Sequence, residues 1–188
     1  MPPSRTHIRN VTAEYLGRHP EEREALLPLL GALARPADPT SRKTYPGHIT
    51  CSAIAIDRHD RVLHIHHSIL DKDLAPGGHI ESVDTTLPGA ALRELQEETD
   101  ILSSALLTLN GYEDIPLDIN VHNIAANPSR GEPAHQHYDF RFAFRLLSER
   151  QIHLQAEEVT DYRWLPFAKV TAPTIARKLA LLGRSMSF

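Results

Sequence analysis

The chain has 188 residues, of which 41% are hydrophobic and 23% charged, values typical of a globular protein. This length suits a single domain with a substantial core. The formal net charge of -4 excludes the strong basic field expected of a nucleic-acid-binding protein. The single cysteine, Cys51, excludes an internal disulfide framework and fits a reducing compartment.

Two segments bear on targeting and membrane insertion. The first ten residues, "MPPSRTHIRN", lead into polar helix rather than into the apolar core of a signal peptide. The longest apolar run, "ALLPLLGALA" at 25–34, is too short and too interrupted to span a bilayer. We therefore expect a cytoplasmic protein that has no membrane partner.

The N-terminal part of the chain predicts helix. Apolar residues recur at helical spacing after Pro20 and the acidic residues that follow it: Ala25, Leu26, Leu29, Leu30 and Leu33. Pro28 is expected to kink this helix, and "RPADPTSR" to end it. Residues 1–45 are thus predicted to form a helical extension, a hairpin packed on a main domain of residues 46–188.

The pattern then changes to that of strands. "HITCSAIAI" at 48–56 and "RVLHIHH" at 61–67 predict a hairpin joined by the turn "DRHD". A helix is predicted from Leu87 to Thr99, with Thr86 as its N-cap and Pro88 in its first turn. Asp100 is expected to end that helix in the left-handed conformation.

The remaining segments complete the predicted fold. Strands are expected in "ALLTLNGYEDIPL" (105–117), "DINVHNIAA" (118–126), "HYDFRFAFRLL" (137–147) and "TDYRWLPF" (160–167). A last helix is expected from about Ala172 to Leu182, with Thr171 as its cap and Gly183 as its stop. Strands flank a central helix and a second helix closes the chain, which predicts an α+β fold or an α/β/α sandwich.

Three glutamates on the central helix point to a cation. Glu94, Glu97 and Glu98 stand at positions i, i+3 and i+4, so their carboxylates leave one face and repel one another. Oxygen donors grouped in this way suit Mg²⁺ or Mn²⁺. A solvated helix face is what the glutamate run by itself most often means. The glycines, the acidic residue and Arg93 that precede the run favour the metal site.

The same stretch resembles the Nudix box, Gly-x5-Glu-x7-Arg-Glu-apolar-x-Glu-Glu-x-Gly-apolar. Gly78 matches the first glycine, Asp84 the acidic position and "RELQEETDI" (93–101) the second half. Asp84 replaces a glutamate, and eight residues instead of seven separate it from Arg93. Asp100 stands where the family usually has glycine. Glu81 is an alternative for the acid of the box.

The resemblance implies a Nudix fold, with a mixed β-sheet inside the sandwich. It also implies hydrolysis of a pyrophosphate bond in a nucleoside diphosphate linked to another moiety, with water attacking phosphorus. Mg²⁺, or Mn²⁺, would then be held by Glu94, Glu97, Glu98 and a backbone oxygen of Gly77 or Gly78. Arg93 would orient a carboxylate. These three glutamates and Arg93 make up the expected catalytic set.

The general base stays open at this point. Glu97 or Glu98 is suited to accept the proton of the attacking water. Glu132, in "SRGEPAH", and Glu158, before the last predicted strand, are outside candidates. Each of these two is plainly explained as a surface glutamate.

Four residues are candidates for contact with the substrate: His79, Arg130, His137 and Asp139. His79 directly follows the glycines. His135, His137 and Asp139 alternate along a predicted strand and so share one face, as do His64 and His66. Coordination of Zn²⁺ by these His-x-His pairs, and ordinary hydrogen-bonded strand histidines, remain as alternatives.

Two rival functions share the fold. A non-catalytic sensor that binds a nucleotide would be expected to lose box carboxylates, yet all three glutamates are present. An isopentenyl-diphosphate isomerase would need a cysteine opposite a glutamate, and Cys51 is more typical of a core residue. We expect a nucleotide-type small molecule as partner, expect no nucleic acid, and leave a homodimer open.

Overall fold

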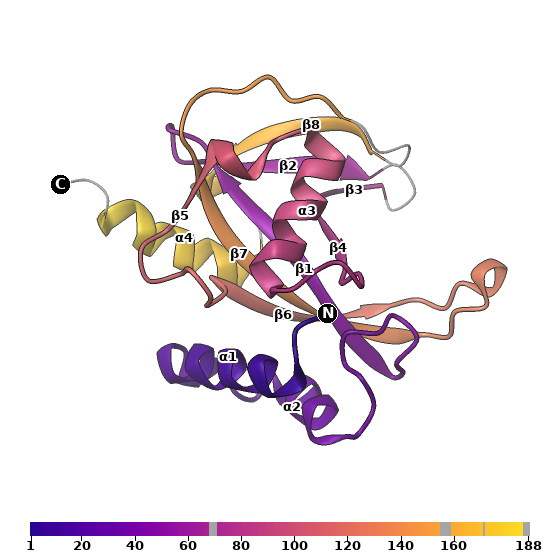
Figure 1. The fold of residues 1–188 in the computed structure, drawn as a ribbon. Helices are drawn as coiled ribbons and strands as arrows, with labels where there is room; N and C mark the ends of the chain where they lie inside the picture. The colour runs from indigo at the N-terminus through magenta and orange to yellow at the C-terminus, as the bar shows by residue number, and fades with distance from the viewer. Residues whose placement is uncertain (68–70, 155–158, 171, 186–188) are drawn as a thin grey trace.

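The computed structural model describes residues 1–67, 71–154, 159–170 and 172–185. The helices are α1 (Arg5–Arg18), α2 (Leu27–Ala34), α3 (Leu87–Thr99) and α4 (Pro173–Ser185). The strands are β1 (Gly47–Ile56), β2 (Arg61–His67), β3 (Lys72–Leu74), β4 (Gly77–His79), β5 (Leu106–Thr108), β6 (Asp118–Ile124), β7 (His135–Leu146) and β8 (Val159–Pro166) (Figure 1). In this part of the chain, no helix is long and apolar enough to cross a membrane.

The described strands form one eight-stranded sheet with the order β3-β2-β1-β7-β5. Off this path, β4 pairs with β1, β6 with β7, and β8 with β2. The β1 strand runs parallel to β7, from the pair Gly47 and Gln136 to the pair Ile56 and Arg145. The other pairs are antiparallel. The sheet is therefore mixed, as the resemblance implied.

Alternation along β1 divides the core into two layers. Cys51 and Ala53 belong to the hydrophobic cluster that contains Leu95 of α3. Ile54, which points to the opposite face of the sheet, packs in a second cluster with Ile175 of α4. The sheet thus lies between α3 and α4, which confirms the predicted α/β/α sandwich.

The α3 helix begins and ends where its capping residues predict. The hydroxyl of Thr86 accepts a hydrogen bond from the backbone N–H of Gly89 at 3.0 Å, which satisfies one donor of the first turn. At the other end Asp100 adopts the left-handed conformation, with φ of 61°. Its backbone N–H donates to the carbonyl of Gln96 at 2.9 Å. Local chemistry therefore determines both ends of this helix.

Replacement of Asp100 tests this C-cap. We expect Asp100→Gly to raise the free energy of unfolding by up to about 1 kcal/mol, because glycine adopts positive φ without a Cβ penalty. Asp100→Ala should lower it, since alanine has neither this freedom nor the polar side chain of aspartate. Urea unfolding of the three proteins measures both changes, and a more stable alanine variant would contradict the C-cap assignment.

Several predicted boundaries were wrong. Pro28 does not kink a long helix: a 3-10 turn at Pro20–Glu22 comes first, and α2 begins at Leu27, so Pro28 lies in a first turn that tolerates it. Gly183 does not stop α4, which continues to Ser185. Thr171, its predicted cap, lies outside the described residues.

The segment 105–117 was also predicted too long. Only Leu106–Thr108 pair as a strand, after a 3-10 turn at Ser103–Ala105. Gly111, with φ of 81°, and the prolines and aspartates that follow favour turns. The short strands β3 and β4 were missed because three residues are too few to show an alternating pattern.

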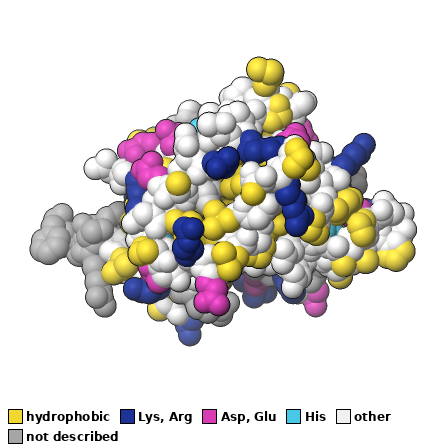
Figure 2. Space-filling model, turned by 90° about the horizontal axis from the view of Figure 1, so that it is seen from below, with side chains coloured by type: hydrophobic (Ala, Val, Ile, Leu, Met, Phe, Trp, Pro, Cys, Tyr) yellow, Lys and Arg dark blue, Asp and Glu magenta, His cyan; other side chains and the backbone are white. Residues whose placement is uncertain are grey.

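The helices α1 and α2 lie together below the sheet (Figure 1). Their buried hydrophobic residues belong to the same cluster as those of α3: Ile8, Val11, Tyr15, Leu16, Leu29 and Leu33. On the face seen from below, hydrophobic side chains gather in the middle, and Lys and Arg side chains lie around them (Figure 2). Side chains of these helices and of the turn between them line a pocket: Leu16, Leu30 and Leu33, with Arg9 and Arg23 beside them.

A buried amine connects α4 to the N-terminal helices. Lys178 is only 4% exposed, and its Nζ lies 2.8 Å from Glu22 and 2.7 Å from Asp118. It also donates to the hydroxyl of Tyr15, which in turn donates to Glu22. Burial, aided by the charge of Asp118, raises the pKa of Tyr15 far above its ordinary value, so the phenol stays neutral.

Loss of this amine should destabilise the fold. We expect Lys178→Met to lower the free energy of unfolding by about 3 kcal/mol, because it removes the cation from the partly buried Glu22 and leaves the buried Asp118 with Arg141 alone. Arg177→Met is the matched control: the side chain of Arg177 is 73% exposed, and its loss should cost less than about 0.5 kcal/mol. Denaturant unfolding compares the two, and equal losses would contradict a structural role for Lys178.

Candidate active site

A tight backbone contact places the predicted metal ligands. The β4 strand pairs with β1 so that Gly77 lies opposite Ser52 and Gly78 opposite Cys51. A Cβ on Gly78 would lie 2.5 Å from the carboxylate of Glu94. A Cβ on Gly77 would collide with the hydroxyl of Ser52. Glycine at position 78 therefore allows the carboxylate of Glu94 to approach this strand, and glycine at position 77 allows the strand to lie close against β1.

The three glutamates differ in their surroundings. The carboxylate of Glu98 accepts a hydrogen bond from the backbone N–H of Gly77 at 3.0 Å. Glu94 has a side chain that is 15% exposed, and together with Glu98 it lines a large cleft. The side chain of Glu97 is 55% exposed and lies against Arg93, with 2.8 Å between Oε2 and Nη1. Two of the predicted ligands, Glu94 and Glu98, thus line the cleft, whereas Glu97 is exposed beside Arg93.

Arg93 holds the loop before α3 in place. Its Nε and Nη2 donate to the two oxygens of Asp84 at 3.0 and 2.9 Å, a bidentate pair. Nη2 also donates to the backbone carbonyl of His79 at 2.8 Å. Asp84 is 5% exposed and accepts the backbone N–H of Glu81 at 2.7 Å. The extra loop residue therefore does not separate Asp84 from Arg93, and Glu81 does not take its place.

The charges of this group perturb one another. Burial lowers the pKa of Arg93, but its hydrogen bonds with Asp84 and the nearby charge of Glu94 outweigh that effect and raise it above its usual value. Burial raises the pKa of Glu94 from 4.5 to about 6, although Arg93 opposes the change. Ionising this half-buried carboxylate costs free energy, and a divalent cation beside it would stabilise the ionised form. The donor set of carboxylate and backbone oxygens fits Mg²⁺ or Mn²⁺.

The floor of the cleft is a polar network across three strands. Asp139 of β7 accepts hydrogen bonds from Ser52 at 2.8 Å and Thr50 at 3.2 Å, both on β1. The guanidinium of Arg141 donates to Asp139 at 2.9 Å and to Asp118 of β6 at 3.2 Å. Asp139, a predicted substrate contact, is thus 5% exposed and already engaged within the protein. The partners Thr50, Ser52 and Asp118 were missed because only the strand pairing brings them together.

The other candidates fall into two groups. His79, Arg130 and His137 all line the cleft. Glu132 instead accepts a hydrogen bond from Arg42 at 3.1 Å. Glu158 lies outside the described residues.

Cys51 does not face the cleft. It is fully buried on the side of β1 that packs toward α3, and burial raises the pKa of its thiol. The residues before and after it, Thr50 and Ser52, point the other way and line the cleft. A thiol that is fully buried away from the cleft argues against the cysteine chemistry of an isomerase.

Comparison with known proteins identifies the family. The NUDIX domain model matches residues 46–182, and the chain belongs to this family. It is a Nudix-type hydrolase, as the box predicted. A probable DHNTP pyrophosphohydrolase of Lactococcus lactis subsp. cremoris (strain MG1363) is 27% identical over 126 residues, which cover 67% of this chain and 71% of the relative.

Solved structures agree on the fold. An Ap4A hydrolase of C. elegans superimposes with a TM-score of 0.56 at 15% identity, over 73% of this chain and 98% of the other. The dihydroneopterin triphosphate pyrophosphohydrolase of E. coli gives a TM-score of 0.51 at 20% identity, over 73% and 95%. At such identities the likeness concerns the fold alone.

Because the pKa of Glu94 is raised, replacing this carboxylate should increase the stability of the folded protein, and the increase should depend on pH. In metal-free buffer at pH 8 the folded protein carries an ionised, half-buried carboxylate, whereas well below pH 4.5 the group is protonated both folded and unfolded. Glu94→Gln should therefore raise the free energy of unfolding by up to about 2 kcal/mol at pH 8 and by almost nothing at about pH 3.5.

Thermal unfolding in excess EDTA at both pH values measures this difference. Glu149→Gln, at a glutamate whose side chain is 64% exposed, serves as the control and should change little at either pH. An equal gain at both pH values for Glu94→Gln would show that ionisation of Glu94 is not the cause.

Proposed function

We propose that the protein uses a divalent metal ion to hydrolyse a pyrophosphate bond in a nucleoside diphosphate linked to another moiety. The observation that carries the proposal is the convergence of Glu94, Glu98 and the glycines of β4 at the wall of one cleft. Membership of the NUDIX family supports the same reaction type.

The metal would be Mg²⁺ or Mn²⁺. Glu94, Glu97 and Glu98 would hold it, together with the backbone oxygen of Gly78. When bound, such an ion neutralises charge on phosphate oxygens and makes water a better nucleophile. Glu97 leaves the same face of α3 as the other two and pairs with Arg93.

The chain supplies positioning and a base. Arg93, fixed by Asp84, keeps the β4 turn against α3 through the carbonyl of His79. Glu98, which lines the cleft, or Glu97 would accept the proton of the attacking water. Glu132 and Glu158 remain lesser candidates for that base.

Substrate contacts would come from the cleft residues His79, Arg130 and His137. Asp139 would act mainly by orienting Ser52 and Arg141 at the floor. We also propose that residues 1–45 are an extension of the domain at 46–188, because the family match begins at residue 46, just before β1.

A second candidate substrate is dihydroneopterin triphosphate. The relative from Lactococcus lactis, a probable DHNTP pyrophosphohydrolase, matches over 71% of its own length and favours this choice. A pterin triphosphate presents the same phosphate chemistry to the carboxylates, so the site residues would keep their roles.

A product assay tests the proposal. The substrate panel contains nucleoside diphosphate derivatives and dihydroneopterin triphosphate. Wild-type protein should release phosphate-containing products from at least one of them when Mg²⁺ or Mn²⁺ is present, and from none when EDTA removes the metal. Glu97→Gln and Glu98→Gln should each lower kcat by at least about 100-fold, because each removes a metal ligand or the base. Glu149→Gln should retain full activity.

The assay also separates the rival function. Tight binding of one nucleotide, with no turnover by wild-type protein and binding unchanged in Glu97→Gln and Glu98→Gln, would favour the non-catalytic sensor. Full activity in both glutamine variants would contradict the assigned roles even if the protein is a hydrolase.

A further inference from the structure

A cluster of histidines on strands of the sheet borders the cleft, which its members His122 and His137 line. The pairing of three strands creates it: His48 of β1 is opposite His137 of β7, which is opposite His122 of β6. His135 precedes His137 by two residues and points to the same face. The ring centroid of His48 lies 4.9 Å from that of His135 and 4.9 Å from that of His137.

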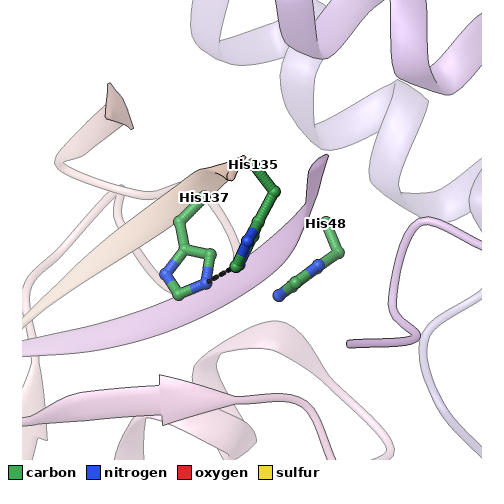
Figure 3. A group of neighbouring side chains, drawn as sticks. All are labelled: His48, His135 and His137. Atoms are coloured by element: carbon green, nitrogen blue, oxygen red, sulfur yellow. Dashed lines mark hydrogen bonds between the residues drawn. The ribbon is translucent and has the colours of Figure 1, made fainter. Parts of the chain in front are cut away.

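The nitrogens of this cluster face one another. Nε2 of His135 lies 3.2 Å from Nε2 of His137, and their rings come together in Figure 3 with His48 beside them. One ligand nitrogen from each of His48, His135 and His137 lies within 4.8 Å of the other two. A tetrahedral ion with bonds of 2.0–2.1 Å to nitrogen separates its ligands by roughly 3.3 Å, so small side-chain rotations would bring all three into place.

Backbone carbonyls orient two of the rings. Nδ1 of His135 lies 2.8 Å from the carbonyl oxygen of Pro133, and Nδ1 of His48 lies 3.2 Å from that of Thr44. A carbonyl can only accept, so Nδ1 carries the proton and Nε2 of the neutral ring keeps its lone pair. Nε2 of His135 faces Nε2 of His137, and Nε2 of His48 lies 3.1 Å from Nε2 of His79, which an ion at His48 would displace as partner. Protein ligands of zinc have this arrangement, in which a hydrogen bond at one ring nitrogen fixes the other for the metal.

Two of the three rings are buried, and two have a lowered pKa. His48 is 1% exposed and His135 is 8% exposed. Burial lowers the pKa of His48, and burial together with the neighbouring histidines lowers that of His137 to about 2. The rings of His48 and His137 are therefore neutral near pH 7, and neither has to lose a proton before an ion binds.

We propose that His48, His135 and His137 bind one late first-row transition metal ion, with Zn²⁺ the ion that suits them best. Three imidazole nitrogens favour Zn²⁺, Co²⁺ or Ni²⁺ over Mg²⁺, whereas the carboxylates of α3 favour the harder ion. Three protein ligands leave a fourth position for water or another donor. His137 lines the cleft, so that position would be reachable from the cleft. The site does not depend on the proposed hydrolysis.

Cobalt titration tests the site directly. Full-length protein without an affinity tag is stripped of metal, placed in excess Mg²⁺ to occupy the glutamates, and titrated with Co²⁺ while visible absorption is recorded. We expect one equivalent of Co²⁺ to give the intense bands of tetrahedral coordination and Zn²⁺ to displace it. His48→Asn and His135→Asn should each weaken binding at least about 100-fold, and His153→Asn, at an exposed histidine, should not.

Thermal unfolding of the same proteins gives an independent measure. Zn²⁺ should raise the Tm of wild-type protein and of His153→Asn but not that of the two cluster variants, whose metal-free Tm and circular dichroism show whether they fold. If His48→Asn fails to fold, His135→Asn alone decides. Absence of cobalt bands in wild-type protein, unchanged affinity in His135→Asn, or loss of the bands in Glu94→Gln would overturn the proposal.

Discussion

The parallel pairing of β1 with β7 is the constraint on which both the cleft and the histidine cluster depend. About eighty residues of chain separate the two strands, so no local turn sets their register, and the pairing is fixed by burial on both faces. One face of β1 packs on α3, and the other places Thr50 and Ser52 beside Asp139 and Arg141. A slip of one residue would exchange these faces and remove the polar floor of the cleft.

Features with local causes were predictable from the sequence. The α3 helix has its predicted bounds because Thr86, Pro88 and Asp100 act within one turn of its ends. The box glutamates and Arg93 share a helix face for the same reason, and the family follows from them. Pro28 shows the limit of such reasoning: a proline can bend a helix or begin one, and only the preceding 3-10 turn shows which.

Features that depend on distant segments were not predictable. The sequence shows His135 and His137 two residues apart, but it does not show that His48, nearly ninety positions earlier, lies against them. The engagement of Asp139 by Ser52 and Arg141 is hidden in the same way, which is why a candidate for substrate contact proved to be part of the sheet's own network. Strand register, rather than residue type, carries this information.

The buried ion pairs at Lys178 have a consequence for the boundaries of the protein. A continuous series of ion pairs runs from Glu22 through Lys178, Asp118 and Arg141 to Asp139 at the floor of the cleft. Glu22 belongs to the segment that precedes the residues matched by the family model. The segment that matches the family model is therefore smaller than the part of the chain whose charged groups pair with one another. A fragment trimmed to residues 46–182 would keep the whole box, but it would leave the ammonium of Lys178 with Asp118 and without Glu22 and Tyr15.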